Sequence, residues 1–196
     1  MKNLKKIISV MTLVLTMFIG SNASAQELSA LSKDTTFISY VKDQLEFNKN
    51  SNIELVNELA SQEEMGEGQL ELFYEAFKTN DKGYASFVKT QQGRLNVLYQ
   101  VYELESLSAE DLSPYFEDTL TQLGVGQEQN QTMGDNCGRR YRNTLAINLG
   151  TAVVAHLGCG FADMTVVAGL ICHGAVYLVH SAADDNAYLD YLDCIK

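Results

Sequence analysis

The spacing of the cysteines constrains the fold more than any other feature of this sequence. All four lie in the last 60 of the 196 residues. Cys137 and Cys159 are 22 residues apart, and so are Cys172 and Cys194. The residue numbers of the outer pair, Cys137 and Cys194, therefore have the same sum as those of the inner pair, Cys159 and Cys172. Residues that face each other in an antiparallel hairpin share that property. The spacing therefore favours one long hairpin closed by two nested disulfides, Cys137–Cys194 and Cys159–Cys172.

A second pairing of the same cysteines stays open. A bend at residues 182–185 would join Cys172 to Cys194 and leave Cys137 for Cys159. A continuous helix between Cys137 and Cys159, however, would hold their sulfurs about 33 Å apart, which is far beyond the reach of a disulfide. This pairing needs Cys137 to lie in a loop that folds back, so we favour the nested one.

A zinc site is the alternative chemical use of these residues. His156, Cys159, Cys172 and His173 supply four ligands of the type that zinc prefers. Cys172 and His173 are neighbours on a helix, however, and point about 100° apart. An exported chain also favours disulfides over thiolates, so we expect neither a metal nor another cofactor. His173 and His180 are seven residues apart and share one face of a helix.

The first 25 residues have the three parts of a cleaved secretory signal peptide. Lysines precede an apolar stretch at residues 7–20, and the small residues Ala23 and Ala25 suit a signal peptidase. The stretch has 14 residues. At about 1.5 Å per residue it is too short to cross a hydrocarbon core of about 30 Å. We expect cleavage before Gln26 and a secreted or periplasmic product.

Charge divides the rest of the chain into two regions. Residues 26–136 contain 20 acidic and 7 basic side chains, whereas residues 137–196 contain 5 and 4. We expect an acidic helical domain at 26–123, a polar, glycine-containing linker at 124–136 and a cysteine-containing apolar helical module at 137–196. A nucleic-acid partner requires a surface rich in Lys and Arg, and the excess of acid excludes that class.

Apolar residues in the acidic region recur every three or four positions, which is the period of amphipathic helices. Phe37 and Val41 begin one such series, and turn-forming residues separate it from the next. We therefore expect an all-α fold in which four or five short helices form a bundle. Near its end, Ser113 and Pro114 fit an N-cap followed by proline at the first helical position, and Gly124 fits a C-terminal stop.

The C-terminal module contains two apolar stretches at 143–162 and 164–183, next to a turn signal at 158–160. Each stretch is long enough to span a bilayer. Polar residues such as His156 are costly in lipid, so we favour a packed Gly/Ala-rich helical hairpin or three-helix module over a membrane hairpin.

Two further patterns bear on the shape of that module. Every fourth residue from Ala146 to Gly158 is small or β-branched, which makes a ridge that lets a second helix approach closely. Asp184 and Asp185 fit the N-terminus of a short final helix, where negative charge complements the helix dipole.

Three functions remain, and no catalytic residues can be named for any of them. The first is an exported, non-enzymatic protein that binds an unknown protein or small ligand. The second is a membrane-active protein with residues 137–196 as effector and 26–136 as an acidic shield. In layout, though not in motifs, the chain resembles secreted bacteriocin precursors, which implies membrane contact by the C-terminal module. The third is a hydrolase, although none of the common catalytic motifs is present. We favour the binding protein because it requires neither a catalytic site nor a membrane-active surface.

Overall fold

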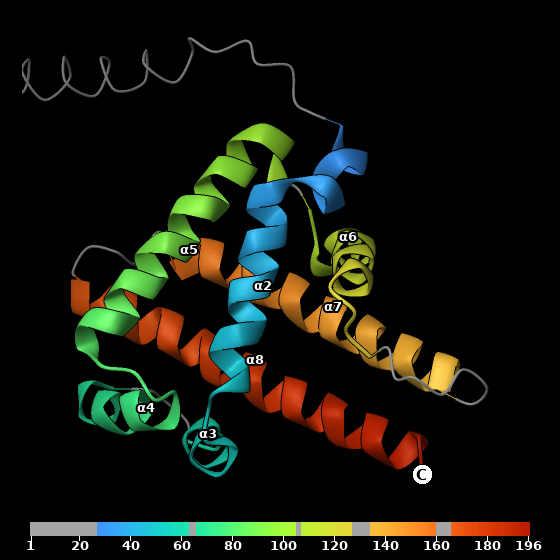
Figure 1. Ribbon diagram of the computed structural model, residues 1–196. Coiled ribbons are helices and arrows are strands. Elements are labelled where there is room, and N and C mark those ends of the chain that lie inside the picture. Colours follow the sequence, from blue (N-terminus) through green and yellow to red (C-terminus); the bar gives the residue numbers. More distant parts are fainter. Residues whose placement is uncertain (1–26, 63–65, 105–106, 127–133, 160–165) are drawn as a thin grey trace, which may run out of the picture.

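The computed structural model describes residues 27–62, 66–104, 107–126, 134–159 and 166–196, and these contain helices and no strands (Figure 1). This confirms the predicted all-α fold. The expected signal peptide lies outside these residues. In chain order the elements are the 3₁₀ helix η1 (Leu28–Lys33), α2 (Thr35–Lys49), α3 (Ile53–Ala60), the 3₁₀ helix η2 (Glu67–Gln69), α4 (Leu70–Ala76), α5 (Asp81–Tyr102), α6 (Ala109–Gln122), α7 (Gly134–Cys159) and α8 (Val166–Cys194).

The last two helices form a long antiparallel hairpin, which α2 crosses in the view of Figure 1. Two disulfides hold it. Cys137 is bonded to Cys194 at the open end, with 5.8 Å between their Cα atoms, and Cys159 is bonded to Cys172 near the tip, with 5.7 Å. The structure thus contains the nested pairing and a disulfide-stapled C-terminal region. Disulfides are typical of proteins in an oxidising compartment, such as the extracellular space or the periplasm.

Helix α8 continues without a break to Cys194, which excludes the alternative cysteine pairing and decides for the hairpin over the three-helix module. No bend exists at 182–185, and the described part of the module has two long helices and no third. Asp184 and Asp185 were expected at a helix N-terminus, but they lie deep inside α8. The expectation failed because Asp184 is fixed by side chains from two other helices, which local sequence does not reveal.

Both hydrophobic cores contain residues from the acidic region and from the hairpin. In the first, Phe37 of α2 and Phe116 of α6 pack with Leu149 of α7. In the second, Phe73 of α4 packs with Tyr177 of α8. The shorter helices therefore pack directly on the hairpin. The expected domain boundaries and linker stay a prediction, and residues 127–133 of that linker lie outside the described ones.

The small-residue ridge on α7 does bring a second helix close, but that helix is α6. A Cβ built on Gly150 would lie 2.7 Å from the backbone oxygen of Ala109 at the start of α6. Ala146 is buried beside it, whereas Val154 is 44% exposed. Only the first half of the ridge is therefore covered, and at Gly150 the helix that approaches is α6 and not the other helix of the hairpin.

Helix α6 begins five residues earlier than its proline suggested. Ser108 is the N-cap, and it exchanges hydrogen bonds with Asp111 in a capping box. Pro114 consequently lies inside the helix, and Ser113 is not a cap. The reciprocal bonds of a capping box satisfy two helix-end donors, more than a lone serine can. Gly124 follows the helix in a left-handed conformation with φ 74°, as predicted.

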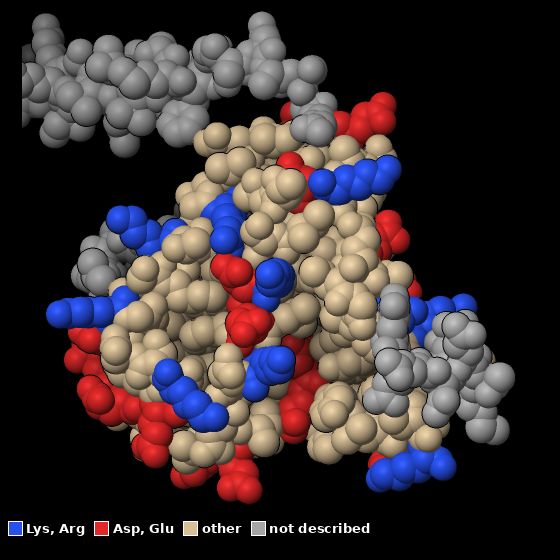
Figure 2. Space-filling view, viewed as in Figure 1, with Lys and Arg blue, Asp and Glu red and all other residues tan. Residues whose placement is uncertain are grey.

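Acidic side chains gather at the end of the molecule formed by α3 and α4 (Figure 2). The exposed carboxylates there include those of Glu54, Glu58, Glu71 and Glu75. Among the residues that the structure describes, no helix combines the length and the apolarity needed to cross a membrane.

Candidate functional site

Three buried histidines line the face of the hairpin that packs on the shorter helices. His156 of α7 and His173 and His180 of α8 are 3%, 2% and 4% exposed. His173 and His180 share a face of α8, as their spacing predicted, and Tyr177 lies between them on that face. Buried imidazoles require hydrogen-bond partners, so the neighbours of each histidine decide what the face can do.

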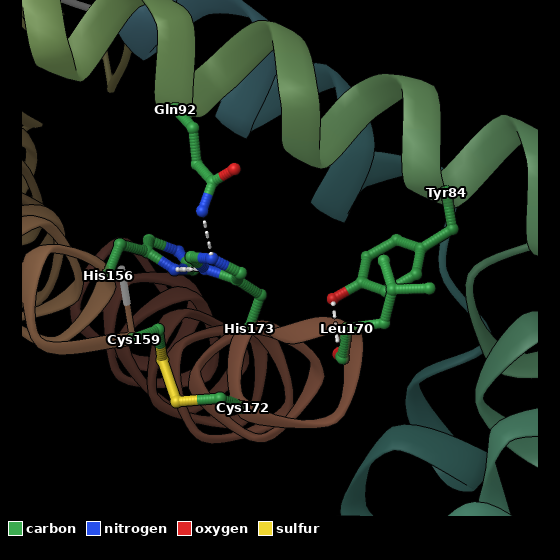
Figure 3. Close-up of a disulfide and its surroundings, with 7 residues drawn as sticks. All are labelled: Tyr84, Gln92, His156, Cys159, Leu170, Cys172 and His173. Carbon is green, nitrogen blue, oxygen red and sulfur yellow. Dashed lines mark hydrogen bonds between the residues drawn. A yellow bond between two sulfur atoms is a disulfide. The ribbon is translucent and has the colours of Figure 1, made fainter. Parts of the chain in front are cut away.

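His156 and His173 contact each other directly, near the Cys159–Cys172 disulfide (Figure 3). Their Nδ1 atoms are 2.8 Å apart, and Nε2 of His173 lies 2.6 Å from the side-chain nitrogen of Gln92 on α5. Because an amide nitrogen only donates, Nε2 of His173 accepts and its Nδ1 donates to His156. The proton of neutral His156 then sits on Nε2, which is buried and has no hydrogen-bond partner among the described residues.

This environment disfavours a charge on His156. Burial lowers the pKa of His156 well below its usual value, and the neighbouring His173 and His180 lower it further. Its ring also lies 4.6 Å from that of Tyr177, whose hydroxyl accepts a hydrogen bond from Gln44 of α2 at 3.0 Å. The neutral His156–His173 pair thus links α7 and α8 to α5 through Gln92. The neighbouring Tyr177 links α8 to α2 through Gln44.

Asp184 connects three helices further along the hairpin. Its carboxylate accepts hydrogen bonds from the amide of Asn48 on α2 at 3.2 Å and from that of Asn148 on α7 at 3.0 Å. Nε2 of His180, one turn earlier on α8, lies 3.3 Å from the same carboxylate. Burial raises the pKa of Asp184, and His180 and the two amides oppose that shift. Ser181 donates to Asn48 at 2.7 Å and extends the network.

A groove with a volume of about 410 Å³ runs between α7 and α8. We call it the hairpin groove. Its walls are mostly small apolar side chains, which cannot fill the space between two helices, and two polar residues of the Asp184 network also line it. The lining residues are Asn148, Thr151, Ala152, Ala155, Ala175, Val176, Val179, His180 and Ala183.

The hairpin groove combines the properties of a small-molecule site. Its volume falls within the usual range for ligand pockets, which is about 300 to 1,000 Å³. Its walls are mostly apolar, and its polar residues are few: Asn148, which donates to Asp184 of α8, Thr151, which donates to the backbone of α7, and His180. Val179 at its edge is 65% exposed, so apolar surface continues from the groove to solvent.

The residues proposed as zinc ligands come close together, but in another chemical state. Cys159 and Cys172 form a disulfide, so they supply neither thiolate ligands nor a nucleophile. His156 and His173 turn their Nδ1 atoms toward each other. In the described part of the chain, no group of three or more His, Cys, Asp or Glu side chains could hold a metal ion.

Sequence reasoning missed Asp184 as a hub and missed the hairpin groove. Asp184 bonds to Asn48 across 136 positions of sequence, and no local pattern signals such a contact. The small residues that line the groove were visible, but their spacing alone does not separate a groove from a tight contact. Comparisons with protein-family models, curated proteins and solved structures found no match, so function has to be inferred from the geometry.

Proposed function

We propose that this chain is an exported, non-enzymatic binding protein whose hairpin groove takes a small apolar ligand. The groove itself is the observation that carries the proposal. Six of its nine lining residues are Ala or Val, and they leave about 410 Å³ between α7 and α8. Export rests on the signal-like residues 1–25 and agrees with the two disulfides.

The disulfides support this function because they fix the groove before a ligand arrives. Cys137–Cys194 closes one end of the hairpin and Cys159–Cys172 the other. Two helices tied at both ends cannot close on each other or separate freely. A site held in its binding shape loses little conformational entropy when the ligand enters, which favours affinity.

Titration with a neutral apolar dye, N-phenyl-1-naphthylamine, tests the proposal. Its fluorescence should rise and saturate on binding the wild-type protein. Ala155→Phe places a ring in the groove and should weaken binding by at least about tenfold, or about 1.4 kcal/mol. Val97→Phe is the matched control, because Val97 is 50% exposed on α5 and does not line the groove. Absence of saturable binding, or equal weakening by both variants, would refute the proposal.

Exposed apolar side chains on the hairpin favour a second candidate, the bacteriocin-like membrane-active protein. Ile147, Val154 and Val179 are 40%, 44% and 65% exposed. In this role the hairpin would act at a membrane surface, with residues 26–136 as its acidic shield. Because the shield would silence the intact chain, release of a dye trapped in lipid vesicles only after proteolytic removal of residues 26–136, at neutral or mildly acidic pH, would support it. Saturable dye binding by the intact chain, with no vesicle leakage before or after that proteolysis, would leave the groove-binding function alone.

A further inference from the structure

We infer that the hairpin groove takes the alkyl chain of a zwitterionic amphiphile, whose head group lies against Arg140 and Asp190 at the open end of the hairpin. This inference rests on the proposed function and names its ligand class. It depends on a second, smaller hollow between α7 and α8, which we call the end pocket and which these two residues help to line.

The end pocket lies on the same face of the hairpin as the groove. Residues that line the two hollows recur along each helix at the three- and four-residue spacing of one helix face. On α7, Thr144 of the end pocket is one turn before Asn148 of the groove, and on α8, Ala187 is one turn after Ala183. The two hollows therefore lie in line between the same two helices.

The two hollows differ in size and in chemical character. The groove has about 410 Å³, within the usual range of about 300 to 1,000 Å³ for ligand pockets, whereas the end pocket has about 60 Å³ and is too small for such a ligand by itself. None of the residues that line the groove is charged, whereas Arg140 and Asp190 line the end pocket. A single molecule with an apolar chain and a small charged head group matches both hollows.

The length of this face also suits an amphiphile. Arg140 is 15 positions before Ala155, which lines the groove near the tip of the hairpin. At about 1.5 Å per residue, the face from Arg140 to Ala155 is about 22 Å long. An extended molecule can therefore lie along the hairpin with its chain toward the tip and its head group toward the open end.

The charges of the end pocket favour a zwitterionic head group. Arg140 and Asp190 are exposed, and in the described part of the chain neither side chain has a hydrogen bond or an ion pair. An anion or a cation alone would be attracted by one of these side chains and repelled by the other. A head group such as phosphocholine presents an anionic part to Arg140 and a cationic part to Asp190, so both contacts are attractive.

Three probes that share a decyl chain and differ in the charge of the head group test this inference. Decylphosphocholine is zwitterionic, decyl sulfate is anionic and decyltrimethylammonium is cationic. Each is used below the concentration at which it forms micelles and is measured by displacement of N-phenyl-1-naphthylamine from the wild-type protein at neutral pH. Because exposed ion pairs are weak, we expect decylphosphocholine to displace the dye at a concentration about fivefold lower than either charged probe. Equal displacement by the three probes, or a charged probe as the strongest competitor, would overturn the inference.

Two variants assign the preference to residues. With Arg140→Gln, decyltrimethylammonium should compete at least as well as decylphosphocholine, and with Asp190→Asn, decyl sulfate should do so. Arg139→Gln and Asp193→Asn are the matched controls, because they remove the same charges from exposed residues that do not line the end pocket. Both controls should keep the wild-type order of the probes. An equal effect of a variant and its control contradicts the assignment.

Calorimetric titration with decylphosphocholine measures the same contact without the dye. The affinity should fall about threefold in Arg140→Gln and stay unchanged in Arg139→Gln. The same affinity in both variants, or no binding to the wild-type protein, would overturn the inference. Saturable dye binding without a preference among the three probes would refute the head-group site alone and leave the proposed function standing.

Discussion

The acidic region and the hairpin bury different kinds of residue. The short helices of residues 27–126 bury large aromatic side chains such as Phe73, Tyr84 and Phe116, each with no exposed surface. The hairpin also buries large side chains such as Tyr177, but it combines them with small residues such as Ala146 and Ala152 and with the polar His156 and His173. Because hydrophobic stabilisation scales with the apolar area removed from water, an aromatic core supplies more of it per residue than a surface of Ala and Gly.

The hairpin offsets this smaller hydrophobic contribution in two ways. Its two disulfides limit the conformations of the unfolded chain, and its buried polar groups bond to α2 and α5. The same small side chains that reduce hydrophobic burial leave the hairpin groove open. The comparison suggests that the acidic region supplies most of the hydrophobic stability, while the hairpin carries the binding surface.

The largest loss is expected from the aromatic core. Phe73 is fully buried, with ring centroids 4.6 Å from Phe77 and 4.7 Å from Tyr84. Phe73→Ala should lower the free energy of unfolding by about 3 to 5 kcal/mol, because it removes buried area and leaves a cavity. The adjacent Leu72 is 42% exposed, so Leu72→Ala should change the free energy of unfolding by about 0.5 kcal/mol or less. Urea unfolding compares the two; similar losses would contradict the assignment of stability to this core.

The next largest losses of unfolding free energy are expected from removal of the disulfides. Cys137 and Cys194 are 57 positions apart and Cys159 and Cys172 are 13 apart. If the bridges act by restricting the unfolded chain, replacing the outer pair by alanine should cost about 4 kcal/mol and the inner pair about 3 kcal/mol. Urea unfolding of the two double variants measures both losses. The reverse order would show that local packing at the tip outweighs chain entropy.

Replacing a glycine by alanine should change the stability of the protein in opposite directions in the two regions. Gly150 meets the backbone of α6, so Gly150→Ala should destabilise the protein by about 1 to 3 kcal/mol. Nothing lies within 4 Å of a Cβ built on Gly93 in α5. Gly93→Ala should therefore stabilise it by about 0.5 to 1 kcal/mol through helix propensity. Thermal melting of both variants gives the two signs, and a stabilising Gly150→Ala would mean that α6 can move away from α7.

The smallest effect concerns pH. Because the pKa of His156 is lowered in the folded protein, the unfolded chain binds a proton first as the pH falls below the usual value of 6.5. Stability from neutral His156 is thus present above that pH and is lost as the pH falls toward the lowered pKa. One proton contributes at most about 1.4 kcal/mol per pH unit. His156→Leu should flatten the decline in unfolding free energy between neutral and mildly acidic pH; an unchanged slope would exclude His156 as its source.

The sequence by itself determined the helices and the register of the hairpin. Apolar periodicity is a local property, and it is enough to specify an all-α chain. The cysteine spacing predicted a nested pairing because the register of an antiparallel hairpin is a relation between residue numbers. Gly124 likewise ended α6 through its own backbone freedom. The serine cap was misplaced at Ser113 because two local signals competed, and the capping box at Ser108 satisfies more donors.

Only the tertiary structure decided what the hairpin contacts and what it leaves open. Gly150 packs on α6, and His173 reaches Gln92 across 81 positions of sequence. Asp184, which was expected at the start of a helix, lies inside α8 and accepts hydrogen bonds from Asn48 and Asn148. These contacts depend on how whole helices cross, and helix crossing is set by all the side chains at the interface together. The hairpin groove has the same origin, since a row of small residues becomes a cavity or a contact according to which helix lies against it.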